Sequence, residues 1–257
     1  MCSKVLRPIA AALLVAASAC GGGEKEPAPA APPANAQRVD PSTAGGIVGR
    51  ISFEGTPPEN PKVKLSGDPM CTRAHADGMA FENYIVTDGG LDNVFVYVKD
   101  GLGNYYFDAP AQPVKIDQQG CRYVPHVIGV QAGQSVEITN SDDTMHNVHA
   151  VPDVNREVNI GQHTKDQKDI HTFTAAEVMV PLKCDLHPWM NAYVGVVAHP
   201  YYAVTKDGGK FELKNLPAGT YTVEAWHEKA GTQTQQVTIG QKETKDVTFT
   251  FTSASGN

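Results

Sequence analysis

Short runs in which apolar and polar residues alternate with a period of two restrict the fold of this chain more than any other feature. Side chains along a strand point to opposite faces of a sheet, so a strand with one buried face shows this period. No stretch of ten or more residues shows a clear helical period of 3.6, and Gly, Asn and Asp stand between the runs. The alternating runs cover residues 47–55, 93–101, 134–142, 209–216, 219–228, 234–240 and 245–253. This pattern predicts an all-β protein made of β-sandwiches.

Length and charge restrict the class of protein further. The 257 residues allow one large domain or two modest ones. Acidic residues outnumber basic ones, 28 to 21, which gives a formal net charge of −7. Because a nucleic-acid-binding protein needs a basic surface, this charge argues against nucleic acid as a partner. The five cysteines are too few for a small disulfide-stapled scaffold, and their odd number means that at least one does not pair within the chain.

Residues 1–19 have the pattern of a secretory signal peptide. Lys4 and Arg7 are basic, an apolar stretch covers 9–17, and small residues suit cleavage after Ala19. Such a segment is too short to span a bilayer as a mature helix. Removing it takes away two of the 21 basic residues and leaves 19 against 28 acidic ones, a net charge of −9. We therefore expect the mature protein outside the cytosol, where disulfides persist.

Cleavage after Ala19 would make Cys20 the first mature residue, which resembles the lipobox of bacterial lipoproteins. The resemblance implies that Cys20 carries lipid and anchors the protein to a membrane, and Gly21 after it favours the outer membrane. Residues 20–44 are rich in Gly, Ala and Pro and would form a tether that holds the folded part off the surface. The alternative is an exported protein cut at the same bond without lipid, which would be soluble in the periplasm.

The end of the chain, residues 199–253, resembles the carboxypeptidase-regulatory-like, prealbumin-type β-sandwich. The likeness rests on the motifs Asp207-Gly208-x-x-Phe211 and Leu216-Pro217-x-Gly219-x-Tyr221. Parts of the segment 45–110 resemble the opening strands of the same domain. Two arrangements stay open: a discontinuous sandwich with a second domain inserted, or a separate layer of N-terminal strands.

The segment from Cys184 to Met190 carries most of the chemical information. It places a thiolate at Cys184, an imidazole at His187 and a thioether at Met190, each three residues apart, so that one loop can direct all three at one point. Pro188 stiffens the loop and Trp189 can shield that point from water. Sulfur and imidazole ligands suit copper, and two His, one Cys and a weak axial Met make a blue-copper electron-transfer site. The loop therefore predicts a second His from elsewhere.

That His lies in the run 140–149, which follows a predicted strand and contains His146-Asn147-Val148-His149. Together with the Cys-x2-His-Pro-aromatic-Met loop, this run resembles the cupredoxin family, especially its amicyanin branch. The resemblance covers residues 111–198 and implies a Greek-key sandwich that binds one copper ion. It implies the ligands His146, Cys184, His187 and Met190. It also implies that Asn147 ties the two loops together near the sulfur, that His187 lies nearest the surface, and that Pro188 and Trp189 belong to a docking patch.

His146 is favoured over His149 by strand geometry. An offset of three residues places the two side chains on opposite faces of a strand, so only one can easily join the loop. Val148, two residues on from His146, provides an apolar neighbour on the same face.

Zinc is disfavoured because a thioether is a poor fourth ligand, and a binuclear copper centre would need two cysteines in the loop. The pairs Cys71-x3-His75 and Cys121-x4-His126 could form a second metal site, but a Cys71–Cys121 disulfide is the simpler account in an exported protein.

With four protein ligands and no open position, we expect a one-electron carrier rather than an enzyme. Its partner would be a redox protein of the cell envelope. The rival functions are copper trafficking and a structural or adhesion module with a secondary metal site.

Overall fold

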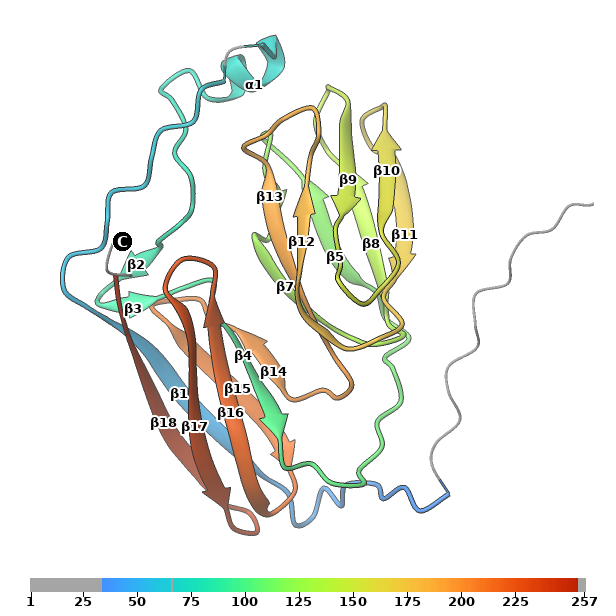
Figure 1. Ribbon diagram of the computed structural model, residues 1–257, viewed down its shortest axis with the longest axis vertical. Helices are drawn as coiled ribbons and strands as arrows, with labels where there is room; N and C mark the ends of the chain where they lie inside the picture. The colour runs from blue at the N-terminus through green and yellow to red at the C-terminus, as the bar shows by residue number, and fades with distance from the viewer. Residues whose placement is uncertain (1–33, 66, 254–257) are drawn as a thin grey trace, which may run out of the picture. The chain divides into compact units, whose positions relative to one another are not determined.

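The computed structural model describes residues 34–65 and 67–253. The predicted signal peptide and Cys20 lie outside the described residues. The all-β prediction is confirmed, since the described chain folds into strands β1 to β18 with one short helix, α1 (Figure 1). Four sheets form two sandwiches, which we call the flanking sandwich (β1–β4 and β14–β18) and the inserted sandwich (β5–β13).

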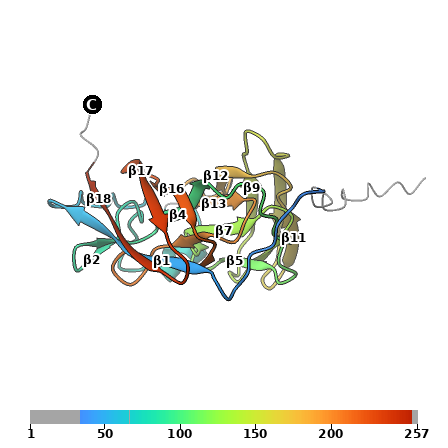
Figure 2. The same ribbon diagram turned by 90° about the horizontal axis from the view of Figure 1, so that it is seen from below.

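The flanking sandwich has one sheet in the order β15-β1-β3-β2, with β18 also paired to β1, and a second sheet in the order β14-β4-β16-β17. β1 and β18 run parallel and side by side in both views (Figures 1 and 2). Each of the two sheets therefore contains strands from before residue 101 and strands from after residue 201. Its strands are β1 (Gly45–Glu54), β2 (Val86–Thr87), β3 (Gly90–Leu91), β4 (Phe95–Asp100), β14 (Tyr202–Val204), β15 (Lys210–Leu216), β16 (Gly219–His227), β17 (Gly231–Ile239) and β18 (Thr244–Thr252).

The period-two pattern explains the core of this sandwich. Val247, Phe249 and Phe251 alternate along β18 and are all buried, whereas Thr248 between them is exposed and Thr250 is half-buried. β15 buries Phe211 and Leu213 in the same way. These side chains meet in one apolar cluster between the two sheets.

The inserted sandwich has sheets in the orders β10-β9-β12-β13-β7 and β11-β8-β5-β6. Its apolar core includes Cys184 and Met190 of the predicted metal loop. Its strands are β5 (Val114–Gln118), β6 (Tyr123–Val124), β7 (Val127–Gln131), β8 (Ser135–Asn140), β9 (His146–Ala150), β10 (Val158–Gln162), β11 (Lys168–Thr172), β12 (Glu177–Lys183) and β13 (Asn191–Val197).

The helix α1 (Pro69–Ala74) is an element that the sequence analysis missed, since six residues are too few to show a helical period. A local signal was present: Asp68 accepts hydrogen bonds from the first N–H groups and Pro69 occupies the first turn. The helix lies in a segment between β1 and β2 that reaches the inserted sandwich, where Cys71 is buried in its core. Among the described residues, no helix has the length and apolar character needed to cross a membrane.

The two sandwiches meet where two glycines leave room for aromatic rings. Gly129 of β7 and Gly195 of β13 are paired neighbours in one sheet. A Cβ atom on Gly195 would lie 2.4 Å from Phe95 of β4, and one on Gly129 would lie 2.3 Å from Tyr202 of β14. The rings of Phe95 and Tyr202 stack with centroids 5.8 Å apart. Only glycine permits this close approach.

We predict that Gly195→Ala lowers the free energy of unfolding by about 1–3 kcal/mol, because the added methyl group would press on the fully buried Phe95 ring. Urea denaturation followed by tryptophan fluorescence measures the change. The double variant Gly195→Ala with Phe95→Leu should lose less than the sum of the two single losses, because Leu leaves space for the methyl group. A Gly195→Ala protein as stable as the wild type would contradict this packing.

Candidate metal centre

The loop between β12 and β13, residues 184–190, is closed by its own backbone hydrogen bonds, and we call it the metal loop. Cys184 follows the last residue of β12, and Met190 precedes the first residue of β13. The N–H of Cys184 donates to the carbonyl of Met190 at 3.1 Å, and the N–H of Met190 donates to the carbonyl of His187 at 2.8 Å. All three residues are buried. The i, i+3, i+6 spacing therefore folds back on itself and directs the predicted ligands inward.

β9 brings the second imidazole to this loop. β12 pairs with β9 on one side and with β13 on the other. Lys183 lies opposite His149, so the loop that follows Lys183 runs past the start of β9, where His146 is the first residue. The Nδ1 atoms of His146 and His187 are 3.0 Å apart, and the Sγ of Cys184 is 3.6 Å from Nδ1 of His187. Potential ligand atoms of the three residues all lie within 4.8 Å of one another. The structure thus assembles a thiol and two imidazoles at one buried point.

His149 lies away from this point. Its Nδ1 contacts the carboxylate of Asp185 at 3.0 Å and its Nε2 contacts Glu157 at 2.6 Å. His146 is fully buried, whereas His149 is partly exposed. The three-residue offset along β9 separates the two side chains in the way that strand alternation requires.

Asn147 links β9 to the metal loop. Its Oδ1 accepts the N–H of Asp185 at 2.8 Å and lies 3.3 Å from the Sγ of Cys184. Its Nδ2 donates to the Asp185 carboxylate at 2.9 Å. Asn147 therefore holds the backbone next to the sulfur as well as contacting the sulfur itself.

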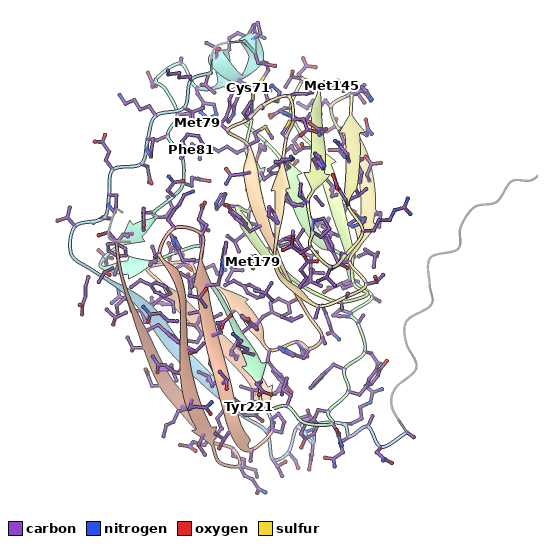
Figure 3. All side chains as sticks on the ribbon, in the orientation of Figure 1. Cys71, Met79, Phe81, Met145, Met179 and Tyr221 are labelled. Atoms are coloured by element: carbon purple, nitrogen blue, oxygen red, sulfur yellow. A yellow bond between two sulfur atoms is a disulfide. The ribbon has the colours of Figure 1, made fainter. Side chains whose placement is uncertain are left out.

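The other residues of the loop differ in burial and in their contacts. Met190 is 1% exposed and packs in the core of the inserted sandwich. Trp189 lies with its ring centroid 5.2 Å from that of His187 and donates its indole N–H to the carbonyl of Cys121 at 3.1 Å. Pro188 is exposed, and so are the apolar side chains of Leu186 and Met145. Met145 and Cys71 both lie at the α1 end of the inserted sandwich, as Figure 3 shows.

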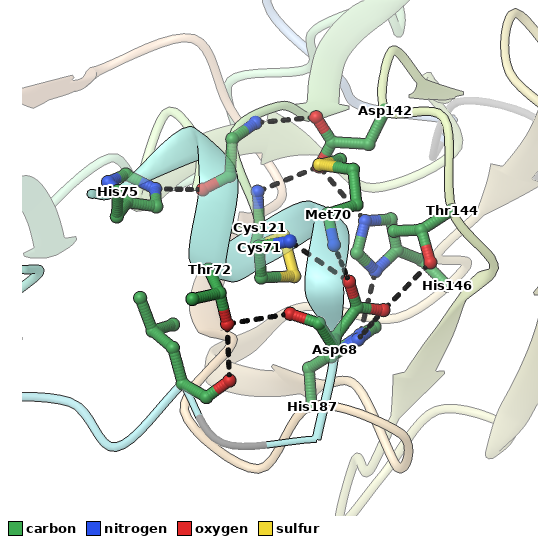
Figure 4. The surroundings of a disulfide bond; sticks show 12 residues. Asp68, Met70, Cys71, Thr72, His75, Cys121, Asp142, Thr144, His146 and His187 are labelled. Atoms are coloured by element: carbon green, nitrogen blue, oxygen red, sulfur yellow. Dashed lines mark hydrogen bonds and ion pairs between the residues drawn. A yellow bond between two sulfur atoms is a disulfide. The ribbon is translucent and has the colours of Figure 1, made fainter.

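His187 is 4% exposed, which is more than His146, Cys184 or Met190, although all four predicted ligands are buried. Nε2 of His187 faces the carboxylate of Asp68, the residue that caps α1, at 3.2 Å. In the same way, Nε2 of His146 faces the carboxylate of Asp142 at 3.0 Å. Figure 4 shows the two imidazoles held between these two carboxylates. Neither carboxylate belongs to a motif that predicted it as part of the site.

The predicted disulfide between Cys71 and Cys121 is present in the structure. Cys71 of α1 and Cys121 are bonded, with their Cα atoms 5.7 Å apart. The second metal pairing considered for His75 and His126 is not formed. His75 Nε2 contacts the carbonyl of Gly120 at 2.6 Å, and His126 pairs with Glu228 at 2.6 Å.

The surroundings of Cys184 favour its ionised form. Burial disfavours the thiolate, but hydrogen bonds from His146, His187 and the backbone N–H groups of Asn147 and Leu186 outweigh it. They lower the pKa of the thiol from 9.0 to about 6. Since the thiolate is the metal-binding form, the site is prepared for a cation.

Hydrogen bonds also outweigh burial in setting the charge of His146. Burial disfavours its protonated form, but hydrogen bonds with Asp142 and Cys184 outweigh this and raise its pKa to about 9. In the absence of a metal, a proton on His146 therefore balances the thiolate. One thiolate and two imidazole nitrogens are donors that copper accepts.

Comparisons with known proteins find likenesses to parts of the chain. The family model of the carboxypeptidase regulatory-like domain matches residues 186–252, from the metal loop to the end of β18. A search of the curated proteins finds no match.

Among solved structures, a purple cupredoxin from Nitrosopumilus maritimus is 20% identical, with a TM-score of 0.28, over 32% of this chain and 98% of that one. The Cu(I) form of a methionine-to-alanine mutant of amicyanin is 27% identical, with a TM-score of 0.30, over 35% of this chain and 86% of that one. A methionine-to-glutamine mutant of amicyanin, also with Cu(I), is 28% identical, with a TM-score of 0.30, over 33% of this chain and 81% of that one.

We predict that Cys184 titrates in the metal-free protein with a midpoint near pH 6, far below an ordinary thiol. Thiolate absorbance near 240 nm should be present at pH 8 and should disappear as the pH falls through 6. Subtracting the titration of Cys184→Ser isolates the signal. A midpoint near 9 would show that the two imidazoles do not stabilise the thiolate.

Proposed function

We propose that this protein is an exported, lipid-anchored type 1 copper protein that carries one electron at a time. The observation that carries the proposal is the buried convergence of Cys184 Sγ with the Nδ1 atoms of His146 and His187. His146 comes from the start of β9 and the other two residues from the loop between β12 and β13, and their donor atoms lie within 4.8 Å of one another, which supports binding of a single ion.

The donor set selects copper among metals. Thiolate and thioether sulfur favour Cu(I), and imidazole accepts both oxidation states of copper. When bound, copper would supply a one-electron couple between Cu(I) and Cu(II). We assign His146, Cys184 and His187 as the main ligands and Met190 as the weak axial ligand.

The protein around the ligands would keep their geometry constant during electron transfer. His146 lies on a strand that pairs with its neighbours, and Cys184 is fixed by backbone hydrogen bonds at both ends of its loop. Asn147 holds the sulfur side of the site and the carboxylates of Asp68 and Asp142 hold the imidazoles. Such outer contacts orient metal ligands and tune the metal. With four protein ligands there is no open position for a substrate, so we infer a carrier rather than an oxidase.

The partner would be a redox protein of the cell envelope. The surface next to the site offers exposed apolar side chains at Met145, Leu186 and Pro188, and we place the docking patch there. Lipid on Cys20 would keep the protein at the membrane, and the tether would end near Gln37, which pairs with Tyr105 of the folded part. The Cys71–Cys121 disulfide suits an oxidising compartment.

We predict that the copper-loaded protein shows an intense visible thiolate-to-copper absorption band and a type 1 electron-paramagnetic-resonance spectrum. Cys184→Ser should abolish the band, because it removes the thiolate. His149→Gln is the matched control and should leave the band unchanged, since His149 contacts Asp185 and Glu157 instead. A wild-type protein that binds Cu(II) without the band is not a type 1 copper protein. Copper binding without a reversible redox couple would favour trafficking.

A further inference from the structure

The metal loop is covered by a segment from outside the inserted sandwich. We call residues 67–82 the cap. The cap contains α1 and lies between β1 and β2 in the sequence, yet it contacts the inserted sandwich at several points. Arg122 donates to the carbonyl of Ala80 at 2.8 Å and forms an ion pair with Glu82 at 2.9 Å. The Cys71–Cys121 disulfide adds a covalent link.

Asp68 of the cap and Asp142 of the inserted sandwich each contact one half of the disulfide and one imidazole. The Asp68 carboxylate accepts the N–H of Cys71 at 2.9 Å, and the Asp142 carboxylate accepts the N–H of Cys121 at 2.7 Å. Each carboxylate also meets the outer nitrogen of one imidazole, Asp68 that of His187 and Asp142 that of His146. Since Cys71 and Cys121 are bonded to each other, the disulfide joins the supports of both predicted histidine ligands (Figure 4).

Asp68 also has a partner in the inserted sandwich besides His187. Thr144, in the loop before β9, donates its hydroxyl to Asp68 at 2.9 Å. Asp68 is therefore held from the cap side by α1 and from the sandwich side by Thr144. Its side chain is 17% exposed, so water competes only partly for its hydrogen bonds.

A carboxylate that accepts a proton from Nε2 of a histidine determines that Nδ1 is the nitrogen able to bind a metal. When Nε2 of an imidazole donates its proton to a carboxylate, Nδ1 keeps a free lone pair, and the ring can no longer turn. Nδ1 of His187 is the atom that faces Cys184 and His146. Asp68 therefore prepares His187 to bind a metal through the correct atom.

We propose that Asp68 is a positioning residue for the metal site and that the Cys71–Cys121 disulfide keeps it in place, so that the cap retains the bound metal. This proposal rests on the proposed copper function. Asp68 holds the outer nitrogen of His187, so loss of this contact would free the ring to turn and would speed the loss of metal.

Two variants of Asp68 separate this role from helix capping. Asn is as good a helix N-cap as Asp, so Asp68→Asn keeps α1 but replaces the carboxylate with a neutral amide. Asp68→Ala removes both functions. Asp77→Asn is the matched control, because Asp77 is an exposed residue of the cap. Far-UV and near-UV circular dichroism verify that each variant is folded.

The first measurement uses metal-free protein. Nuclear magnetic resonance of ¹⁵N-labelled histidine should show a His187 Nε2–H proton protected from exchange in the wild type and in Asp77→Asn. The protection should be lost in Asp68→Asn and Asp68→Ala. A wild-type His187 with its proton on Nδ1 would overturn the proposal.

The second measurement is the rate at which the Cu(II) protein loses its metal to excess chelator. We expect about a 10- to 100-fold faster loss in Asp68→Ala and in the double variant Cys71→Ser with Cys121→Ser, and a smaller increase in Asp68→Asn. Asp77→Asn should behave as the wild type. Copper loss at the wild-type rate in both Asp68 variants would overturn the proposal and leave the copper function intact. A wild type that binds no copper would instead overturn the proposed function, and the role in metal retention with it.

Discussion

The pairing of β12 with both β9 and β13 is the constraint on which the candidate site depends. β12 ends at Lys183, opposite His149 of β9, so the loop that begins at Cys184 runs past the start of β9, where His146 lies. Backbone hydrogen bonds then return the loop to Met190 within seven residues. Because strand pairing sets these positions before any metal arrives, the donor atoms are close together in the protein alone.

The flanking sandwich packs against the inserted sandwich and also connects to the segment that contacts the candidate site. Its strands come from both ends of the folded chain, and the segment between β1 and β2 extends to the inserted sandwich and delivers Asp68 to His187. At the other contact, Gly129 and Gly195 let the rings of Tyr202 and Phe95 approach the sheet closely. The inserted sandwich is therefore held to its neighbour at a packed apolar contact and at a disulfide-linked cap.

Electrostatics and packing act together at the site. Burial alone would keep Cys184 protonated, but two imidazoles and two backbone N–H groups reverse that preference. Two carboxylates in turn stabilise the imidazoles from outside. The Cys184 thiolate is therefore balanced by the proton on His146, which a metal cation could replace.

The sequence by itself determined the strands and the chemistry of the loop. Period-two alternation predicted the all-β fold, since burial of one face of a sheet leaves that pattern. The spacing of Cys184, His187 and Met190 predicted a common point, and the offset between His146 and His149 favoured the first. Only the tertiary structure decided how β1 pairs with β18 and that Asp68 covers His187. These contacts join residues far apart in the chain, 119 positions in the case of Asp68 and His187. No local pattern records them, because they arise from the packing of whole sheets and from a disulfide that draws the cap onto the site.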